Sequence, residues 1–288
     1  MTRVVAIGGG HGLAVTLRAA RSYAEELTAV VSIADDGGST GRLRDSWDVP
    51  APGDVRRCLS ALADPAGTWS RVVERRFDVG ELAGHAVGNL LLLALTEELG
   101  EFQGAVDELS GLLDIDVGRV RVVPVADDPV VLVASVDGRR IEGQVAVAAA
   151  TAIEEVWVEP RSTSCSPLAV GAVRGADQIV LGPGSLFTSV LAAAVVGDLR
   201  EALSRSSART VYVCNLDAEP TETKGFDVAD HVTALVHHGI VPDVVVCQPG
   251  ALPLGDVPCE VVLADLREAP GDGAHDPGRL ASTLAALR

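Results

Sequence analysis

The sequence predicts an α/β protein with a doubly wound, mostly parallel, Rossmann-like sheet and a β-rich insertion near residues 120–158. Three observations support this prediction: short apolar runs that end in glycine, helical patterns between those runs, and one stretch in which strand signals follow one another. Strands that alternate with helices are typical of βαβ units in a parallel sheet. We expect a single domain over residues 1–288, in which residues 120–158 could form a small subdomain.

The elements of the first half follow from apolar runs and helical spacing. Residues 3–7 and 27–34 are apolar runs that lead into glycine-rich turns, and we expect both to be strands. Residues 45–53 contain two prolines and are expected to form a loop. Asp54 could then cap the next helix. The helices predicted in this half cover residues 13–23, 55–63, 88–99 and 102–113.

The middle of the chain changes to strand signals. Asp137-Gly138 predicts a tight turn, after which residues 140–147 return as a hairpin partner of 130–136. The other strands expected in this part cover residues 120–125 and 156–158. The α/β alternation then resumes, with strands at 178–181, 210–214, 244–247 and 261–263, and helices at 168–174, 186–196, 201–204, 228–238 and, after Gly278, up to 287.

Bulk composition excludes several classes of protein. The formal charge of −17 argues against a nucleic-acid partner, because contact with many phosphates needs a basic face. No segment has the roughly 18 uninterrupted apolar residues of a membrane span, and the first apolar run is too short for a signal peptide. The five cysteines are scattered without metal spacing, so we expect them to be reduced and buried in a cytoplasmic protein.

Two glycine-rich turns predict a phosphate site. The first, Gly8-Gly9-Gly10-His11-Gly12, follows a strand, and the second contains Gly37 and Gly38. Backbone without Cβ lets an anion approach closely, and the next helix offers free N–H groups. The first turn is neither a G-x-G-x-x-G fingerprint nor a P-loop, because Leu13 stands where the third glycine would be.

The histidines and the paired aspartates are the side chains of interest beside these turns. None of the six histidines has metal spacing; we expect His11 to contact a ligand, and His237 and His238 to lie on the surface. Asp35 and Asp36 end the second strand, where a Rossmann-type fold places its ribose-binding acid. Together they could instead bind Mg²⁺ beside a nucleotide diphosphate, or be solvated turn residues. No cofactor is otherwise required.

Two later strand ends carry small or polar residues. Gly182-Pro183-Gly184-Ser185 is another turn before a helix that is suited to bind an anion. Ser185 could cap this helix or donate to phosphate. Asn215 follows the next strand. Because parallel strands end at one edge of a sheet, we expect these residues to converge with Gly10 and Gly38 around one large ligand, with room for a pyrophosphate.

Arginines crowd the segment after the second glycine turn in an otherwise acidic chain. Arg42, Arg44, Arg56 and Arg57 could form a cationic lip for a diphosphate. They could also be solvated residues that pair with the aspartates at 45, 48 and 54. The sequence leaves both interpretations open, and the adjacent glycines favour the first.

Several of these segments together resemble the YvcK/CofD-like family, specifically its YvcK branch, whose members are described as gluconeogenesis factors. The likeness extends over nearly the whole chain. The CofD branch, which contains phospholactate transferases, is more distant, because its second-strand motif lacks the long Gly-Gly-Ser-x-Gly-Arg continuation. The matching segments lie at residues 8–13, 34–44, 52–56, 84–85, 88–90, 181–189, 211–215 and 230–232.

The resemblance implies a cytoplasmic protein that binds nucleotide sugars of the UDP-GlcNAc type. It implies support of cell-wall precursor supply and cell shape during gluconeogenic growth, in a branch for which no catalytic reaction is established. Three departures, His11 for Thr, Arg57 for Asn and Phe187 for Tyr, concern the ligand rather than the fold. The ligand-binding residues that we expect are Gly9, Gly10, His11, Gly12, Leu13, Asp35, Asp36, Gly37, Gly38, Ser39, Arg42, Asn89, Gly182, Gly184, Ser185, Phe187 and Asn215.

Two functions remain open on the sequence. The first is a regulatory protein that senses a UDP-sugar and acts through a protein partner in amino-sugar or cell-wall metabolism, as a homo-oligomer. The second is a transferase that moves a phosphate-containing group from a nucleotide donor, as in the CofD branch. In that case Asp35 or Asp36 would hold Mg²⁺ at the leaving diphosphate.

Overall fold

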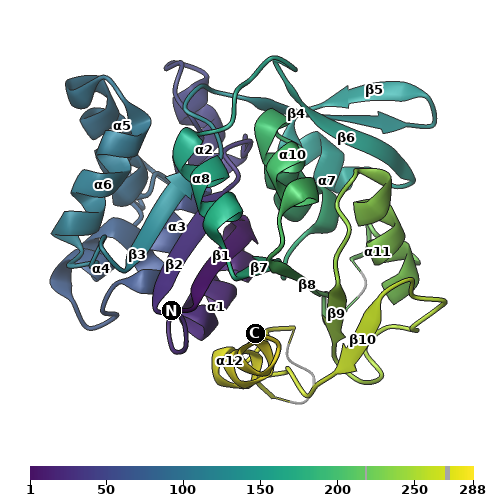
Figure 1. Cartoon of the computed structure of the whole chain (residues 1–288). Coiled ribbons are helices and arrows are strands. Elements are labelled where there is room, and N and C mark those ends of the chain that lie inside the picture. The colour runs from purple at the N-terminus through teal and green to yellow at the C-terminus, as the bar shows by residue number, and fades with distance from the viewer. Residues whose placement is uncertain (218, 270–272) are drawn as a thin grey trace.

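The main body of the protein is a twisted parallel sheet. The computed structural model describes residues 1–217, 219–269 and 273–288. Seven strands, all parallel, form the sheet in the order β10-β9-β8-β7-β1-β2-β3 (Figure 1). The predicted α/β class is therefore confirmed. The strands are β1 Arg3–Gly8, β2 Glu26–Val31, β3 Val120–Pro124, β7 Gln178–Leu181, β8 Arg209–Val213, β9 Val244–Cys247 and β10 Glu260–Leu263.

The strand order reverses at β1. From β1 the chain leads outward to β2 and β3, and it then returns to the other side of β1 to form β7, β8, β9 and β10. The reversal leaves a crevice at the carboxyl ends of β1 and β7, which is where open α/β sheets bind ligands. The central strands β1 and β7 are buried almost completely and apolar nearly throughout, as expected for strands covered on both faces.

Helices cover both faces of the sheet. Helices α1, α3 and α12 pack together on one face, whereas α8 packs on β1, β2 and β3 from the other and contacts α10 (Figure 1). No helix among residues 1–217, 219–269 and 273–288 has the length and apolar character to cross a membrane. The helices are α1 Gly10–Ala20, α2 Gly38–Arg44, α3 Pro52–Leu62, α4 Thr68–Glu74, α5 Val87–Leu99, α6 Phe102–Leu112, α7 Gln144–Ala149, α8 Pro167–Gly175, the π-helical turn η1 Leu186–Leu191, α9 Ala192–Ala194, α10 Gly197–Arg205, α11 Val228–His237 and α12 Pro277–Ala286.

The insertion is a separate small antiparallel sheet, which confirms the predicted break in the alternation. Its strands β4 Val131–Val136, β5 Arg139–Glu142 and β6 Ile153–Glu159 have the order β5-β4-β6 (Figure 1). It begins later than predicted, because β3 pairs with β2 in the main sheet. The hairpin partner is also shorter than predicted, since Gly143, at a φ of 94°, ends β5 and helix α7 follows.

Candidate functional site

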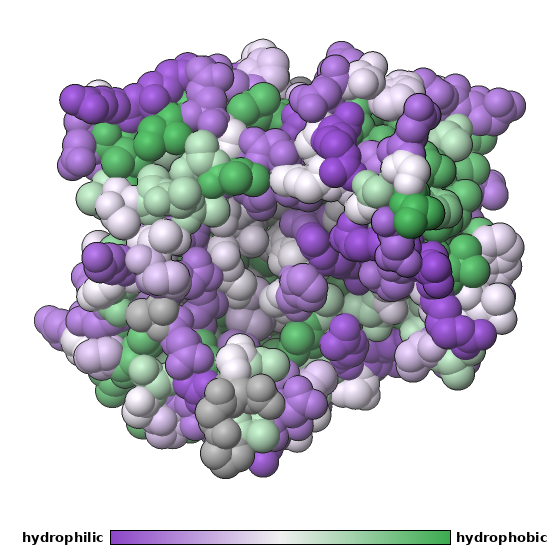
Figure 2. Space-filling model, turned by 180° about the vertical axis from the view of Figure 1, so that it is seen from behind, coloured by the Kyte–Doolittle hydropathy of each residue, from purple (hydrophilic) through white to green (hydrophobic). Residues whose placement is uncertain are grey.

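Three of the predicted strand ends meet at the crevice between β1 and β7. A cavity of about 520 Å³ there is lined by the glycine turn after β1, the turn after β7 and the residue after β8. Figure 2 shows the molecule from behind, hollowed near the centre of this face. The predicted site residues that line this cavity, named here the switch-point cavity, are Gly9, Gly10, His11, Gly12, Gly184, Ser185 and Asn215.

The two turns touch each other through backbone. A Cβ built on Gly12 would lie less than 3.0 Å from the carbonyl oxygen of Pro183, so only glycine fits there. One turn further along α1, the hydroxyl of Thr16 donates to the carbonyl oxygen of Gly182 at 2.6 Å. Gly182 is itself buried beside the cavity. The tight contact fixes the separation of the two strand ends that bound the cavity.

The second glycine turn lies in a neighbouring cavity, so the expected convergence of all four strand ends is only partly correct. Gly37 and Gly38 line a space of about 490 Å³ together with Asp35, Ser39, Arg42 and Asn89. The start of helix α3 separates this cavity from the first. There Gly53 packs against Asp35 and Thr40, while Asp54 packs against Gly9, closely enough that a Cβ on either glycine would clash.

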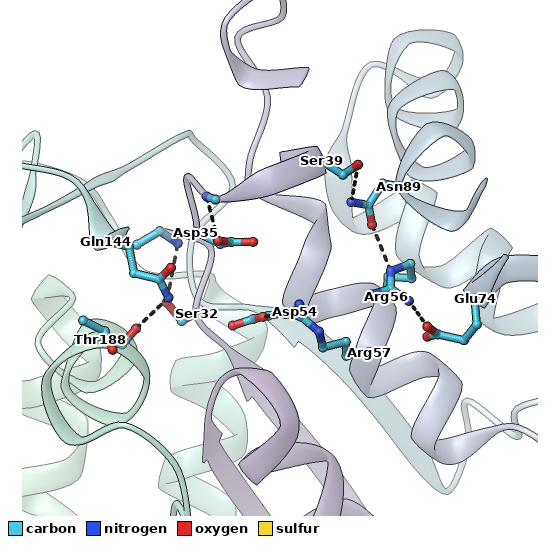
Figure 3. A network of polar contacts seen from close by, with 12 residues as sticks. Ser32, Asp35, Ser39, Asp54, Arg56, Arg57, Glu74, Asn89, Gln144 and Thr188 are labelled. Atoms are coloured by element: carbon cyan, nitrogen blue, oxygen red, sulfur yellow. Dashed lines mark hydrogen bonds and ion pairs between the residues drawn. The ribbon is translucent and has the colours of Figure 1, made fainter. Parts of the chain in front are cut away.

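Asp54 is an internal partner of the first glycine turn rather than a helix cap. Helix α3 begins after Ala51, so Asp54 falls in its first turn. The carboxylate is buried and accepts from Arg57 at 2.5 Å (Figure 3) and from the backbone N–H of Gly10. Burial raises the pKa of Asp54, an effect that Arg57 opposes. The predicted cap is therefore wrong, and the residue links α3 to α1 instead.

Asp35 and Asp36 point in different directions. Asp35 accepts from the backbone N–H of Gly37 at 3.0 Å, within its own turn. Asp36 accepts from the backbone N–H of Val145 at 2.9 Å and so holds the start of α7 in the insertion. The pair therefore does not form one bidentate site, and the described residues contain no cluster of three or more metal-ligating side chains. Magnesium at Asp35 or at Asp36 stays a prediction.

Ser39 and Asn89 line the cavity of the second glycine turn and also belong to a buried polar network (Figure 3). Asn89 donates to Ser39 at 3.1 Å and accepts from the guanidinium of Arg56 at 3.0 Å. Arg56 is also paired with Glu74. The ring of His85 shares a hydrogen bond of 3.1 Å with Ser39. These contacts fasten α2, α3, α4 and α5 together, so the two predicted residues support the site from within.

Two other predicted contacts lie in the core. Leu13 and Phe187 are 0% and 1% exposed. The ring of Phe187 meets Phe226 and His238 edge-on, with centroids 6.2 Å apart in both pairs, and offers no face to a ligand. His238 is buried too and accepts from the backbone N–H of Val156 at 3.0 Å, so its predicted surface position is wrong. The sequence around His238 does not indicate this contact with the insertion.

Two glutamates that follow β8, and that had no signal in the sequence, hold the turn after β7 and the start of η1 through hydrogen bonds. Glu219 lines the switch-point cavity and accepts from the hydroxyl of Ser185 at 3.0 Å and from the side-chain amide of Asn215 at 3.3 Å. Glu222 is buried and accepts from Phe187 N–H and the Thr188 hydroxyl at 3.3 and 2.9 Å. Burial, with the neighbouring Glu219, raises its pKa to about 8.

The arginines follow neither of the two predicted arrangements completely. Arg57 pairs with Asp54, as in the second alternative, but no arginine of the group is paired with the aspartates at 45 and 48 among the described residues. Arg42 donates to the carbonyl oxygen of Ala83, and Arg44 to those of Asp35 and Val130. Arg42, Arg56 and Arg57 line the cavity of the second glycine turn, as a cationic lip would.

The comparisons with known proteins agree with this architecture. A family model described as 2-phospho-L-lactate transferase CofD matches residues 4–263. The gluconeogenesis factor of Bacillus subtilis is 39% identical over 239 residues, covering 82% of this chain and 74% of that protein. A relative from Deinococcus radiodurans is 40% identical over 311 residues, and this chain spans 66% of its length.

A solved structure shows the same fold. The crystal structure of a member of the UPF0052 family from Bacillus halodurans matches with a TM-score of 0.91 and 32% identity, over 98% of each chain. The structural match includes both the parallel sheet and the insertion, because it covers nearly all of this chain. The family model, the relatives and the solved structure all lead to one assignment. The chain belongs to the CofD/UPF0052 family, among proteins named gluconeogenesis factors.

Proposed function

We propose that this protein is a cytoplasmic regulatory protein that binds a nucleotide sugar of the UDP-GlcNAc type in the switch-point cavity. The observation that supports the proposal most is the meeting of the ends of β1, β7 and β8 around about 520 Å³ at the reversal of strand order. Ligands of open α/β sheets bind at such points. A nucleotide sugar carries both the anion and the hydroxyl groups that this lining would meet.

The lining offers acceptors for sugar hydroxyls on one side and backbone donors on the other. Glu219 presents carboxylate oxygens and Asn215 an amide, whereas the carboxylate of Asp217 is paired with Arg267. Carboxylates recognise ribose and sugar hydroxyls well, because each hydroxyl donates a hydrogen bond. His11 and Gly12 lie in the first turn of helix α1, whose N-terminal end favours a negative charge. We therefore propose sugar or ribose near Glu219 and the diphosphate near His11.

The names of the relatives supply the cellular role that we propose. Proteins related over 82% of this chain are called gluconeogenesis factors. A sensor of a UDP-sugar would link growth on gluconeogenic carbon to the supply of cell-wall precursors and to cell shape. It would do so through a protein partner in amino-sugar or cell-wall metabolism, and as a homo-oligomer. Ligand binding would then change affinity for the partner.

Calorimetric titration tests the binding proposal. UDP-GlcNAc, UDP-glucose, NAD and GDP are titrated into the protein, and we expect saturable heat with UDP-GlcNAc. Ser185→Ala, which removes a hydroxyl at the cavity, should weaken this binding, whereas Ser282→Ala on the exposed face of α12 should not. Absence of heat from every nucleotide at millimolar concentration would contradict the proposal.

A transferase of the CofD type is the second candidate, favoured by the family model and by the position of Asp35. Asp35 opens into a cavity that is also lined by Arg56, Arg57 and Arg76, a setting suited to a metal-bound phosphate. This function predicts magnesium-dependent turnover of a nucleotide, detectable by phosphorus NMR, that Asp35→Asn abolishes. An unchanged nucleotide spectrum after long incubation with acceptor alcohols and phosphate esters would leave only the binding role.

A further inference from the structure

A third cavity, on the far side of His11, is lined by arginines. It has a volume of about 520 Å³ and lies where helices α1, α3 and α4 approach one another. Its lining contributes five guanidinium groups and one carboxylate, that of Glu74, in a chain whose formal charge is −17. The arginines are Arg18, Arg56, Arg57, Arg71 and Arg76.

We propose that this arginine cavity binds a second, phosphorylated small molecule, separately from the nucleotide sugar. Guanidinium groups bind phosphate through paired N–H donors in a fixed fork, which makes arginine the preferred residue for such a ligand. The proposal concerns a different cavity from the one assigned to the nucleotide sugar. It therefore does not depend on the identity of that sugar.

The positive charge of the cavity is only partly neutralised by the protein. Asp54 is paired with Arg57, and Glu74 with Arg56. The guanidinium of Arg18 makes no hydrogen bond or ion pair with the residues that the structure describes, and that of Arg76 donates to the carbonyl oxygen of Gly84. Five cations against two carboxylates leave an excess positive charge in a partly enclosed space, where it attracts anions strongly.

A buried hydroxyl provides a further donor. The side-chain oxygen of Ser60, on α3, is buried, lines this cavity and has no hydrogen-bond partner among the described residues. Most buried hydroxyl groups in proteins have a partner, and one without a partner beside a cavity points to a missing acceptor. Ser70 of α4 lines the same wall. A phosphate oxygen would accept from these groups.

The electrostatics at His11 agree with this reading. Burial is the largest cause of the lowered pKa of His11, and the charges of Arg57, Arg56 and Arg18 lower it further. His11 borders both the switch-point cavity and the arginine cavity. It is therefore a neutral ring that separates two spaces of different charge.

The switch-point cavity has the opposite character, which is why we assign the second ligand to a separate place. Its described lining contains Glu219 and Asp217, the latter paired with Arg267, but no arginine or lysine. Burial lowers the pKa of His275 in the same lining to about 4. Donors near it already serve carboxylates of the protein: Gly10 N–H serves Asp54, and Ser185 serves Glu219. A ligand that consists mainly of phosphate, without sugar hydroxyls to donate to these carboxylates, is better matched by the arginine cavity.

Titration of inorganic pyrophosphate tests the proposal. The double variant Arg18→Ala/Arg76→Ala removes two exposed guanidinium groups, and we expect the affinity for pyrophosphate to fall by about tenfold for each arginine. The matched control Arg139→Ala/Arg174→Ala removes two exposed arginines elsewhere and should retain wild-type affinity. Ser185→Ala should leave pyrophosphate binding unchanged, and the Arg18/Arg76 variant should leave UDP-sugar binding unchanged.

Several outcomes would overturn the proposal. They are the absence of pyrophosphate binding at millimolar concentration, an equal loss in the control variant, and a loss confined to Ser185→Ala. Loss of UDP-sugar binding in the Arg18/Arg76 variant would show that the two cavities hold one ligand. Failure of the UDP-sugar alone to bind would remove the proposed function and leave the arginine cavity supported.

Discussion

At the switch point, short distances between backbone segments limit which amino acid can stand at a position. Gly12 touches the carbonyl oxygen of Pro183, so Gly12→Ala must push apart the turns after β1 and β7. We expect it to destabilise the fold by at least about 2 kcal/mol. Gly111→Ala is the matched control, because a Cβ there meets open space in helix α6, and it should stabilise by about 0.5–1 kcal/mol.

Urea denaturation of the two glycine variants measures both effects. A Gly12→Ala protein as stable as the wild type would show that the two turns can separate without cost, and the described crevice would then not be rigid.

The protonation of Glu222 gives a pH dependence of stability. Burial and Glu219 raise the pKa of Glu222 to about 8 from the ordinary value of 4.5, so the folded protein holds a proton that the unfolded chain has lost between these values. The stability that it contributes is fully present below about pH 4.5 and is lost as pH rises through about 8. Glu222→Gln, which cannot ionise, should flatten this decline.

The free energy of unfolding across that pH window provides the measurement. Glu108→Gln, an exposed glutamate on α6, is the control and should keep the slope of the wild type. Parallel curves for wild type and Glu222→Gln would show that the buried carboxyl is ionised in the folded state.

At the scale of elements, Asp36 joins the main sheet to the insertion. Its carboxylate accepts from Val145 N–H at the start of α7, although it follows strand β2. Asp36→Ala should cost about 1 kcal/mol locally, as the loss of a helix cap does. Amide hydrogen exchange should therefore rise in residues 144–149 while β1 and β7 stay protected.

Asp48→Ala, in the exposed loop before α3, should change exchange in neither region. Unchanged exchange at 144–149 in Asp36→Ala would mean that the insertion is positioned by its other contacts alone.

The elements show what sequence can and cannot predict. The strand predicted at residues 178–181 has the same bounds as β7, because an apolar run that ends at a glycine is a clear strand signal. Helices α2 and α4 were missed, since each has seven residues and neither repeats its apolar positions over enough turns to give a signal. The place of β3 was wrong, because an apolar run does not say which sheet it joins.

At the scale of the whole molecule, the sequence predicts that strand ends meet in one cavity only where the strands are neighbours in the sheet. Gly10, Gly184 and Asn215 follow β1, β7 and β8, which are neighbours in the sheet, and they line one cavity. Gly38 was expected beside them but lies beyond the start of α3, whose Asp54 packs against Gly9. Glu219 and Glu222 were missed, because a loop without periodicity gives no indication of which side chain turns inward.

The central claim is that the crevice between β1 and β7 holds a nucleotide sugar. A crystal of the protein soaked in UDP-GlcNAc tests it most directly. The account predicts density between Gly9–Gly12 and Gly184–Ser185, with a sugar or ribose hydroxyl within hydrogen-bonding distance of Glu219. An empty crevice in a crystal whose soaking solution is saturating, or nucleotide bound on another face, would contradict it.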